Sequence, residues 1–244
     1  FNIIAQDTTY YGRDIYGKPS LVELLKELVK IEKVKWLRIQ YAYPHTFTDE
    51  LIDLIASEDK ICNYVDLPLQ HAHNDVLKRM RRSDTKESVE ALLAKLRERI
   101  PGVVIRSSFI VGFPGETDED FAQMLEFLKE IRYDAAYTFL YSKRSGTPAA
   151  TMENQVPQEL KKERLHKLMD TQNEISLEIN QSLLNKTVEV MVEGPSKTDP
   201  NVYTGHTRTN KIILWDHKDE QIGDLVKVKI THPQTWVLKG ELEA

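Results

Sequence analysis

A glycine-rich turn is the feature of this sequence whose spacing best fits ligand binding. Gly112, Pro114 and Gly115 follow the apolar run 103–111. The glycines allow unusual dihedral angles and close approach of the backbone, and the proline fixes its own φ. At the carboxyl end of a parallel strand, such a turn is where α/β sheets bind ligands. A plain strand-to-helix corner fits the same residues, so both interpretations stay open.

Metal-ligating side chains are few. His71 and His73 lie in one predicted loop without a third ligand nearby in the sequence, which favours ordinary polar histidines over a metal site. Cys62 is the single cysteine of the chain, and it fits a small buried apolar residue better than a ligand. A single cysteine excludes an internal disulfide and fits a reducing compartment, the cytoplasm. We predict neither a metal ligand nor a catalytic side chain in these residues.

Composition limits the class of protein. The chain has 244 residues, of which 41% are hydrophobic and 29% charged, with a net charge of −5. This charge argues against a whole-protein electrostatic grip on nucleic acid, although a local basic patch remains open. No apolar run reaches the roughly 18 residues of a membrane helix, so we expect no membrane association. Because Phe1 lies inside a predicted strand, we expect a fragment of a longer protein.

Strands and helices alternate through the first 156 residues. Helix starts are predicted at Ser20, Thr48, Thr85 and Thr117, where a hydroxyl precedes an amphipathic segment. Right-handed crossovers then require a parallel sheet, either closed towards a barrel or open and doubly wound. The predicted strands are residues 1–5, 34–42, 64–69, 103–111 and 135–142.

The pattern changes after Pro157. A long helix is predicted with an apolar seam at Leu165, Leu168, Gln172, Ile175, Ile179 and Leu183. From Lys186 the period becomes two, which indicates a compact antiparallel β-barrel. We therefore divide the chain into residues 1–156, a linker helix 157–185 and a barrel 186–244. From Asn185 onward, eight Lys and Arg face nine Asp and Glu, a balance of −1.

Three segments together carry a resemblance to a known family. Residues 111–117 around the glycine turn, residues 141–149 and residues 172–176 look like the methylthiotransferases. These are radical S-adenosylmethionine enzymes with a terminal β-barrel of the TRAM type, and the match spans the whole chain. The resemblance implies an α/β fold, a partial parallel (β/α) barrel that lacks its first strand here, followed by a small TRAM-like antiparallel barrel.

The resemblance also implies cofactors and partners. The family binds S-adenosylmethionine and two 4Fe-4S clusters and inserts a methylthio group into an unreactive C–H bond. The radical cluster needs a CxxxCxxC loop, which is absent here, so the cluster ligands are not in this chain and the fragment alone should be inactive. Sulfur and electron donors are the further partners, and the protein is expected to be a monomer.

The site residues that the resemblance implies lie near strand ends. Arg106 is expected to pair with the carboxylate of the cofactor's methionine end, or else to bridge to a neighbouring helix, and Glu116 is read as an early-helix carboxylate. Arg208, Asn210 and Lys211 are the expected substrate-binding residues of the barrel, with a solvated hairpin rim as the alternative. The cofactor-binding set is Gln6, Gln70, Arg106, Ser108, Ile110, Val111, Tyr141 and Ser142.

The sequence resembles two branches of the family that modify different substrates. Residues 6–12, 41–44 and 68–71 resemble the RimO type, which modifies an aspartate side chain of a small-subunit ribosomal protein. Residues 138–144, 193–197 and 207–211 resemble the MiaB type, which modifies an adenosine beside the tRNA anticodon. We favour the ribosomal protein because loops at the barrel mouth meet the reacting atom. A non-catalytic module that binds a protein or RNA target is the alternative of another class.

Overall fold

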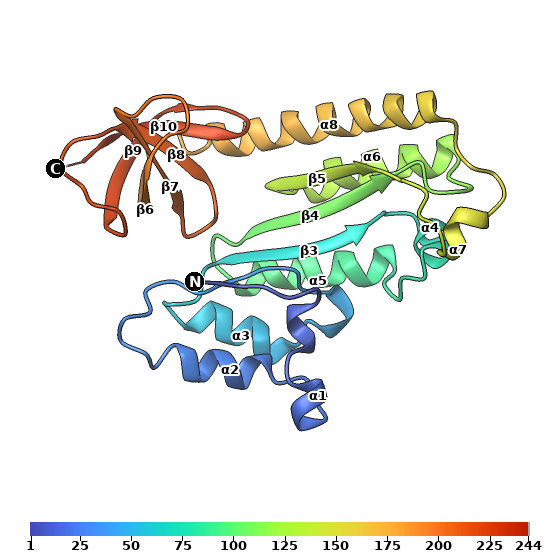
Figure 1. The fold of residues 1–244 in the computed structure, drawn as a ribbon, viewed down its shortest axis with the longest axis horizontal. Helices are drawn as coiled ribbons and strands as arrows, with labels where there is room; N and C mark the ends of the chain where they lie inside the picture. Colours follow the sequence, from blue (N-terminus) through green and yellow to red (C-terminus); the bar gives the residue numbers. More distant parts are fainter. Residues whose placement is uncertain (244) are drawn as a thin grey trace. The chain divides into compact units, whose positions relative to one another are not determined.

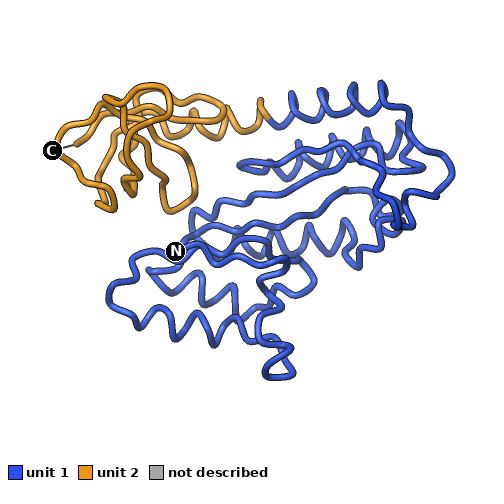
Figure 2. Tube along the Cα trace, viewed as in Figure 1, with its two compact units in different colours: residues 1–172 blue, residues 173–244 orange. Residues whose placement is uncertain are grey.

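The structure is a computed structural model that describes residues 1–243. The chain divides into two compact units, residues 1–172 and residues 173–244 (Figure 2). The division falls inside a single long helix, α8 (Gln158–Gln181). Within the described residues, no helix is both long enough and apolar enough to cross a membrane.

Unit 1 is built on parallel strands (Figure 1). The β1–β2, β3–β4 and β4–β5 pairs are all parallel, which confirms the predicted parallel pairing, and they form a two-stranded sheet, β1-β2, and a three-stranded sheet, β3-β4-β5. A parallel bridge between Leu37 and Ile61 and a hydrogen bond from Ala42 N–H to the Asp66 carbonyl connect β2 to β3. The strands are β1 (Asn2–Ile3), β2 (Arg38–Ile39), β3 (Tyr64–Gln70), β4 (Val104–Val111) and β5 (Ala135–Leu140).

The second predicted strand is much shorter than expected. Residues 34–42 were predicted as a strand, but the ladder covers only β2, Arg38–Ile39. Two features explain the difference. The partner β1 is itself only two residues long, and Tyr41 has a φ of 55°, which no strand residue adopts.

Four helices of unit 1 begin directly after the hydroxyl residues that the sequence predicted, although Ser20 makes no side-chain cap hydrogen bond. Thr48, Thr85 and Thr117 each accept a hydrogen bond from a backbone N–H of the first turn. Phe109 of β4 packs edge-on against Tyr133, which also contacts Phe127 of the helix before β5. The helices of unit 1 are α1 (Arg13–Tyr16), α2 (Leu21–Leu28), α3 (Asp49–Ser57), α4 (Asn74–Arg79), α5 (Lys86–Arg99), α6 (Asp118–Ile131), α7 (Pro148–Thr151) and the first part of α8.

The two faces of β4 differ in how deeply their side chains are buried. Side chains alternate along a strand, and the face with Ile105, Phe109 and Val111 is fully buried. The other face carries Ser108 and Ile110, paired in register with neighbours on β5. Those neighbours are Tyr137 and Phe139, which are 50% and 51% exposed. One face of the sheet is therefore packed, and the other is open at β5.

Helix α8 buries polar side chains. Leu168, Gln172 and Ile175 are buried as the seam predicted, but Leu165, Ile179 and Leu183 are only partly buried. The buried positions also include Lys161, Arg164, Ser176 and Asn180. Leu183, which lies beyond the end of α8, packs against the barrel core, whereas the seam omitted these polar positions, whose charged and amide groups find hydrogen-bond partners inside the fold.

Unit 2 contains a closed five-stranded barrel in the order β10-β8-β7-β6-β9. Trp215, Ile213 and Val190 belong to its buried core. The barrel was predicted as antiparallel. Four pairings are antiparallel, but β10 and β8 pair in parallel, because five strands close the barrel and an odd number cannot alternate in direction all the way round. The strands are β6 (Thr187–Pro195), β7 (Val202–Thr207), β8 (Ile212–Asp216), β9 (Leu225–Pro233) and β10 (Val237–Leu242).

Candidate functional site

The glycine turn lies at the carboxyl end of β4. Gly112 and Gly115 have φ values of 75° and 79°, in the left-handed region that favours glycine. A Cβ on Gly112 would clash with Cγ of Lys161, so this position has room only for a residue without a side chain. Gly115 N–H donates to the carbonyl of Asn154 at 2.9 Å. The backbone of the turn is thus fixed on two sides.

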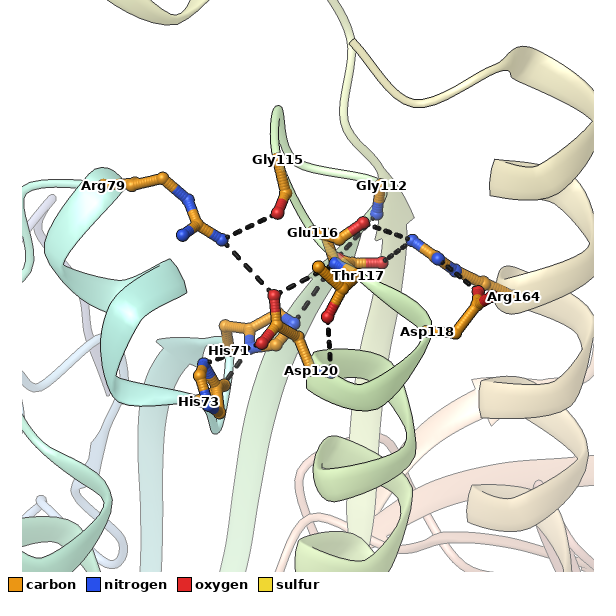
Figure 3. Close-up of polar contacts among 10 residues, drawn as sticks. All are labelled: His71, His73, Arg79, Gly112, Gly115, Glu116, Thr117, Asp118, Asp120 and Arg164. Atoms are coloured by element: carbon orange, nitrogen blue, oxygen red, sulfur yellow. Dashed lines mark hydrogen bonds and ion pairs between the residues drawn. The ribbon is translucent and has the colours of Figure 1, made fainter. Parts of the chain in front are cut away.

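Glu116 is the centre of the polar contacts around this turn (Figure 3). Its side chain is fully buried, and Oε2 accepts a hydrogen bond from Gly112 N–H at 2.8 Å. Oε1 lies 2.7 Å from Nη1 of Arg164. The sequence suggested only an early-helix carboxylate. That reading was incomplete, because Glu116 precedes the N-cap Thr117 and points back into the turn.

His71 brings the end of β3 to the same carboxylate. Its side chain is fully buried, and Nε2 lies 3.4 Å from Oε2 of Glu116. Nδ1 accepts a hydrogen bond from the backbone N–H of His73 at 3.0 Å, which places the proton of the neutral ring on Nε2. Glu116 therefore joins the carboxyl ends of β3 and β4.

A second carboxylate, Asp120, holds the outer side of the turn. It accepts from Thr117 N–H at 3.0 Å and lies 3.1 Å from Nδ1 of His73 and 3.4 Å from Nη2 of Arg79. Burial alone would raise the pKa of Asp120, but the Thr117 hydrogen bonds and the charges of His73 and Arg79 outweigh it and lower the pKa. Arg79 also donates to the Gly115 carbonyl at 3.1 Å, so α4 is tied to the turn.

Two cationic side chains of α8, Arg164 and Lys161, also contact the residues of the glycine turn. Besides Glu116, Arg164 contacts Asp118 at 2.6 Å and is itself only 3% exposed. Lys161 donates to the Tyr141 carbonyl at 3.2 Å, with its ammonium 4.9 Å from the centre of the Tyr141 ring. Burial and the neighbouring Lys143 lower the pKa of Lys161.

Four of the predicted cofactor residues, Gln70, Ile110, Val111 and Tyr141, lie at the carboxyl ends of β3, β4 and β5, and Ser108 is the fifth of eight residues in β4. Gln70 ends β3 with a φ of 77°, and Tyr141 follows β5 and donates its N–H to the Val111 carbonyl at 2.9 Å. Ser108 and Ile110 lie on the open face of β4, whereas Val111 points to the buried face. The buried hydroxyl of Tyr141 has no hydrogen-bond partner among the described residues.

Arg106 lies elsewhere. It was expected near a carboxyl end, but it is the third of eight residues in β4, towards the amino end of the strand. Its guanidinium is paired with Asp66 and donates to the Tyr137 hydroxyl at 3.2 Å. Burial opposes the charge, but Asp66, Tyr64 and Tyr137 outweigh it and raise the pKa of Arg106.

The remaining predicted residues are spread further. Gln6 is exposed and lies with Tyr10, Tyr43 and His45 along an open depression beyond β1. Ser142 is exposed beyond β5.

The predicted substrate residues of unit 2 lie in and beside the turn between β7 and β8. Asn210 has a φ of 66° and closes this turn through Thr207. Lys211 donates to Oδ1 of Asn180 at 2.8 Å, and Asn180 in turn donates to the carbonyls of Gln234 and Thr235. Lys211 thus has a role inside the fold. Arg208 and Lys211 are both partly exposed.

Sequence reasoning missed His71, Glu116, Asp120, Lys161 and Arg164 as members of one cluster. Arg164 is 48 residues from Glu116, so spacing gives no indication of the contact. The one sequence feature that could have indicated the cluster was a cation, such as Arg164, at a position of α8 that faces the fold.

An iron–sulfur cluster does not fit the residues of this chain. Such clusters are held by several thiolates, and Cys62 is the single cysteine, buried to 1% exposure. Among residues 1–243 no group of three His, Cys, Asp or Glu side chains is arranged to hold a metal. S-adenosylmethionine fits better, because β4 and β5 offer an open face with the half-exposed rings of Tyr137 and Phe139.

Comparison with known proteins gives the family. The model of the Radical SAM superfamily matches residues 4–128, more than half of the chain, and the TRAM domain model matches residues 181–242. Coproporphyrinogen III oxidase (HemN) of Escherichia coli, a radical SAM enzyme, has a similar fold with a TM-score of 0.52 at 15% identity, over 78% of this chain and 52% of that one.

Two curated relatives cover nearly all of the chain. The ribosomal protein uS12 methylthiotransferase RimO of Desulforamulus reducens is 46% identical over 98% of this chain and 55% of its own length. A tRNA-2-methylthio-N(6)-dimethylallyladenosine synthase of Acetivibrio thermocellus is 45% identical over 98% of this chain and 50% of its own length. The chain thus spans about half the length of these relatives. It belongs to the radical SAM superfamily, within which it resembles the methylthiotransferases that carry a TRAM domain.

Proposed function

We propose that this chain is the cofactor-binding and target-binding part of a radical S-adenosylmethionine methylthiotransferase. The observation that carries the proposal is the open face of the sheet at its carboxyl ends. There Ser108 and Ile110 lie beside the half-exposed rings of Tyr137 and Phe139. An apolar slot with a few polar groups is the usual form of a small-molecule site. The methylthiotransferase relatives support the same reaction class.

Each residue has a task in this site. Ile110, with Val111 behind it, gives the adenine an apolar support, and Ser108 and Gln70 offer hydrogen bonds. The Tyr141 hydroxyl gains the partner that it lacks in the chain itself. S-adenosylmethionine supplies the radical that activates the C–H bond of the target. Gln6 and Ser142, which are exposed beyond β1 and β5, bind more distant parts of the cofactor, and Arg106 orients Tyr137 through its hydrogen bond to the Tyr137 hydroxyl.

The clusters need ligands beyond these residues. We propose two 4Fe-4S clusters held by cysteines of the whole protein outside this chain, because Cys62 alone cannot hold one. The chain by itself is then inactive. The whole protein works with a sulfur donor and an electron donor, as a monomer in the cytoplasm.

The target that we favour is an aspartate side chain of a small-subunit ribosomal protein. The support is the barrel of unit 2, whose eight basic and nine acidic residues give it no net attraction for phosphates. Methylthiolation of an adenosine in tRNA is the second candidate, favoured by the relative that is named for that reaction.

One experiment separates the candidates. The whole protein, with its clusters reconstituted, is given the ribosomal protein and tRNA together with S-adenosylmethionine and a sulfur donor. Mass spectrometry of both targets then shows where a methylthio group has replaced hydrogen. We expect it on the aspartate. Modification of tRNA alone would support the proposed reaction class but would make tRNA, and not the ribosomal protein, the target.

A further inference from the structure

Helix α8 lies outside the part of the chain that matches the superfamily model. The match ends at residue 128, whereas α8 begins at Gln158. Nevertheless, two side chains of this helix contact the backbone at the ends of β4 and β5. Those side chains are Lys161 and Arg164, and both are at least nine-tenths buried. The cofactor site of this protein therefore extends beyond its superfamily domain.

Arg164 acts on the turn through Glu116. A buried carboxylate needs a charged partner and donors for its lone pairs, because loss of one partner leaves an uncompensated charge. Arg164 supplies this charge at Oε1 and leaves Oε2 to accept from Gly112 N–H. It also donates to the Glu116 carbonyl at 3.1 Å. The orientation of Glu116, and with it the position of Gly112, depends on Arg164 (Figure 3).

Lys161 acts on the same turn by a different route. Its aliphatic stem covers Gly112, where an added Cβ would lie within 3.2 Å of three Lys161 carbons. Its ammonium donates to the carbonyl of Tyr141, and Tyr141 N–H donates to Val111. One lysine therefore fixes the end of β5 relative to the end of β4, the two strand ends that flank the open face.

We propose that Lys161 and Arg164 are positioning residues for S-adenosylmethionine, which set the conformation of the glycine turn from α8 without touching the cofactor. The inference rests on the proposed cofactor site and deepens it. It assigns part of the binding energy of the cofactor to a helix that lies outside residues 4–128, the part matched by the superfamily model. Because the contacts hold the backbone in place, their loss weakens cofactor binding more than it slows the chemistry.

The test uses the whole, cluster-reconstituted protein with Lys161→Met and Arg164→Lys. Lys167→Met, which removes an exposed cation of the same helix, and Leu168→Ala, which removes a buried side chain one turn further on, are the controls. We measure S-adenosylmethionine affinity by equilibrium dialysis, KM and kcat, and deuterium exchange of peptides covering residues 108–117. Urea unfolding of each variant gives its loss of stability.

We expect Lys161→Met and Arg164→Lys to weaken affinity and raise KM by on the order of tenfold, with little change in kcat. Exchange at residues 108–117 should rise in both variants. Leu168→Ala should lose stability yet keep its affinity, and Lys167→Met should change neither. Equal affinity in all variants, or a loss in Leu168→Ala that matches its loss of stability, would overturn the inference. A wild-type protein that does not bind S-adenosylmethionine would instead overturn the proposed function.

Discussion

Arg106 and Asp66 form a two-point ion pair across β3 and β4, with Nη2 2.5 Å from Oδ2 and Nε 3.2 Å from Oδ1. Both side chains are nearly inaccessible, with Asp66 only 1% exposed. A buried pair of this kind costs desolvation that its geometry must recover. Arg106 is therefore first of all a structural residue of the sheet interior.

The pair predicts a large stability effect. Arg106→Ala leaves the Asp66 carboxylate buried without its cation, so we expect unfolding by urea to need about 3–5 kcal/mol less free energy. The double variant Arg106→Met with Asp66→Asn removes both charges and should recover part of this loss. If Arg106 also pairs with the cofactor carboxylate, the double variant should bind S-adenosylmethionine more weakly. Unchanged affinity would remove Arg106 from the site.

Gly112 and Gly102 offer a matched comparison of steric effects. Both have left-handed φ values, but a Cβ on Gly102 meets nothing within 4 Å, whereas one on Gly112 meets Lys161. Gly102→Ala should cost roughly 1–2 kcal/mol for the backbone conformation alone. Gly112→Ala should cost about 1–3 kcal/mol more from overpacking. Combining Gly112→Ala with Lys161→Ala should remove much of that excess, and failure to do so would contradict the proposed contact.

Asp120 predicts a pH dependence of stability. Its pKa in the folded chain is lowered, so its contribution is complete above the pKa of the unfolded chain and is lost as pH falls through the folded value. Urea unfolding measured from pH 6 downwards should show this loss below about pH 5. Asp120→Asn should be less stable at neutral pH and should show a shallower decline. An identical slope in both proteins would exclude Asp120 as a source.

Tyr141 and Tyr133 both bury a hydroxyl that lacks a hydrogen-bond partner among the described residues. Removing such a hydroxyl breaks no bond, so Tyr141→Phe and Tyr133→Phe should be no less stable than the parent protein in thermal unfolding. Only Tyr141 lies at the proposed site. We expect Tyr141→Phe to bind S-adenosylmethionine more weakly and Tyr133→Phe to bind it as before. Equal affinity of the two would remove the Tyr141 hydroxyl from the cofactor contacts.

The charge balance of the unit 2 barrel predicts how strongly the protein binds RNA. With a balance of −1 from Asn185 onward, it should bind tRNA weakly, with a shallow dependence on salt. Removing the charges of Arg208 and Lys211 together should then change little. If they contact phosphates, the slope of log affinity against log salt should instead fall by about two. Such a result, measured by filter binding, would favour tRNA as the target.

Local chemistry made much of the fold predictable. Thr85 and Thr117 were expected to begin helices and do so, because a hydroxyl cap depends only on neighbouring residues. The parallel sheet followed from the alternation of strands and helices. The end of β2 was not predictable, because the positive φ of Tyr41 arises where the chain leaves its short pairing with β1.

The site was less predictable than the fold. The glycine turn was found because Gly112 and Gly115 mark it in the sequence. Its supports were not, because Glu116 meets Arg164 only through tertiary packing. Arg106 shows the opposite error. Its type suggested a ligand contact, but sequence spacing gave no sign that Asp66, 40 residues earlier, would occupy it.

The polar inner face of α8 has a consequence for the order in which the chain is made. A helix with this few buried apolar side chains has little reason to form before it meets a sheet that can satisfy Lys161 and Arg164. Ribosomes release residues 112–116 well before residue 164. During synthesis the glycine turn therefore exists for a time without its contacts to Lys161 and Arg164. We expect it to reach its ligand-binding conformation only when the first half of α8 has left the ribosome.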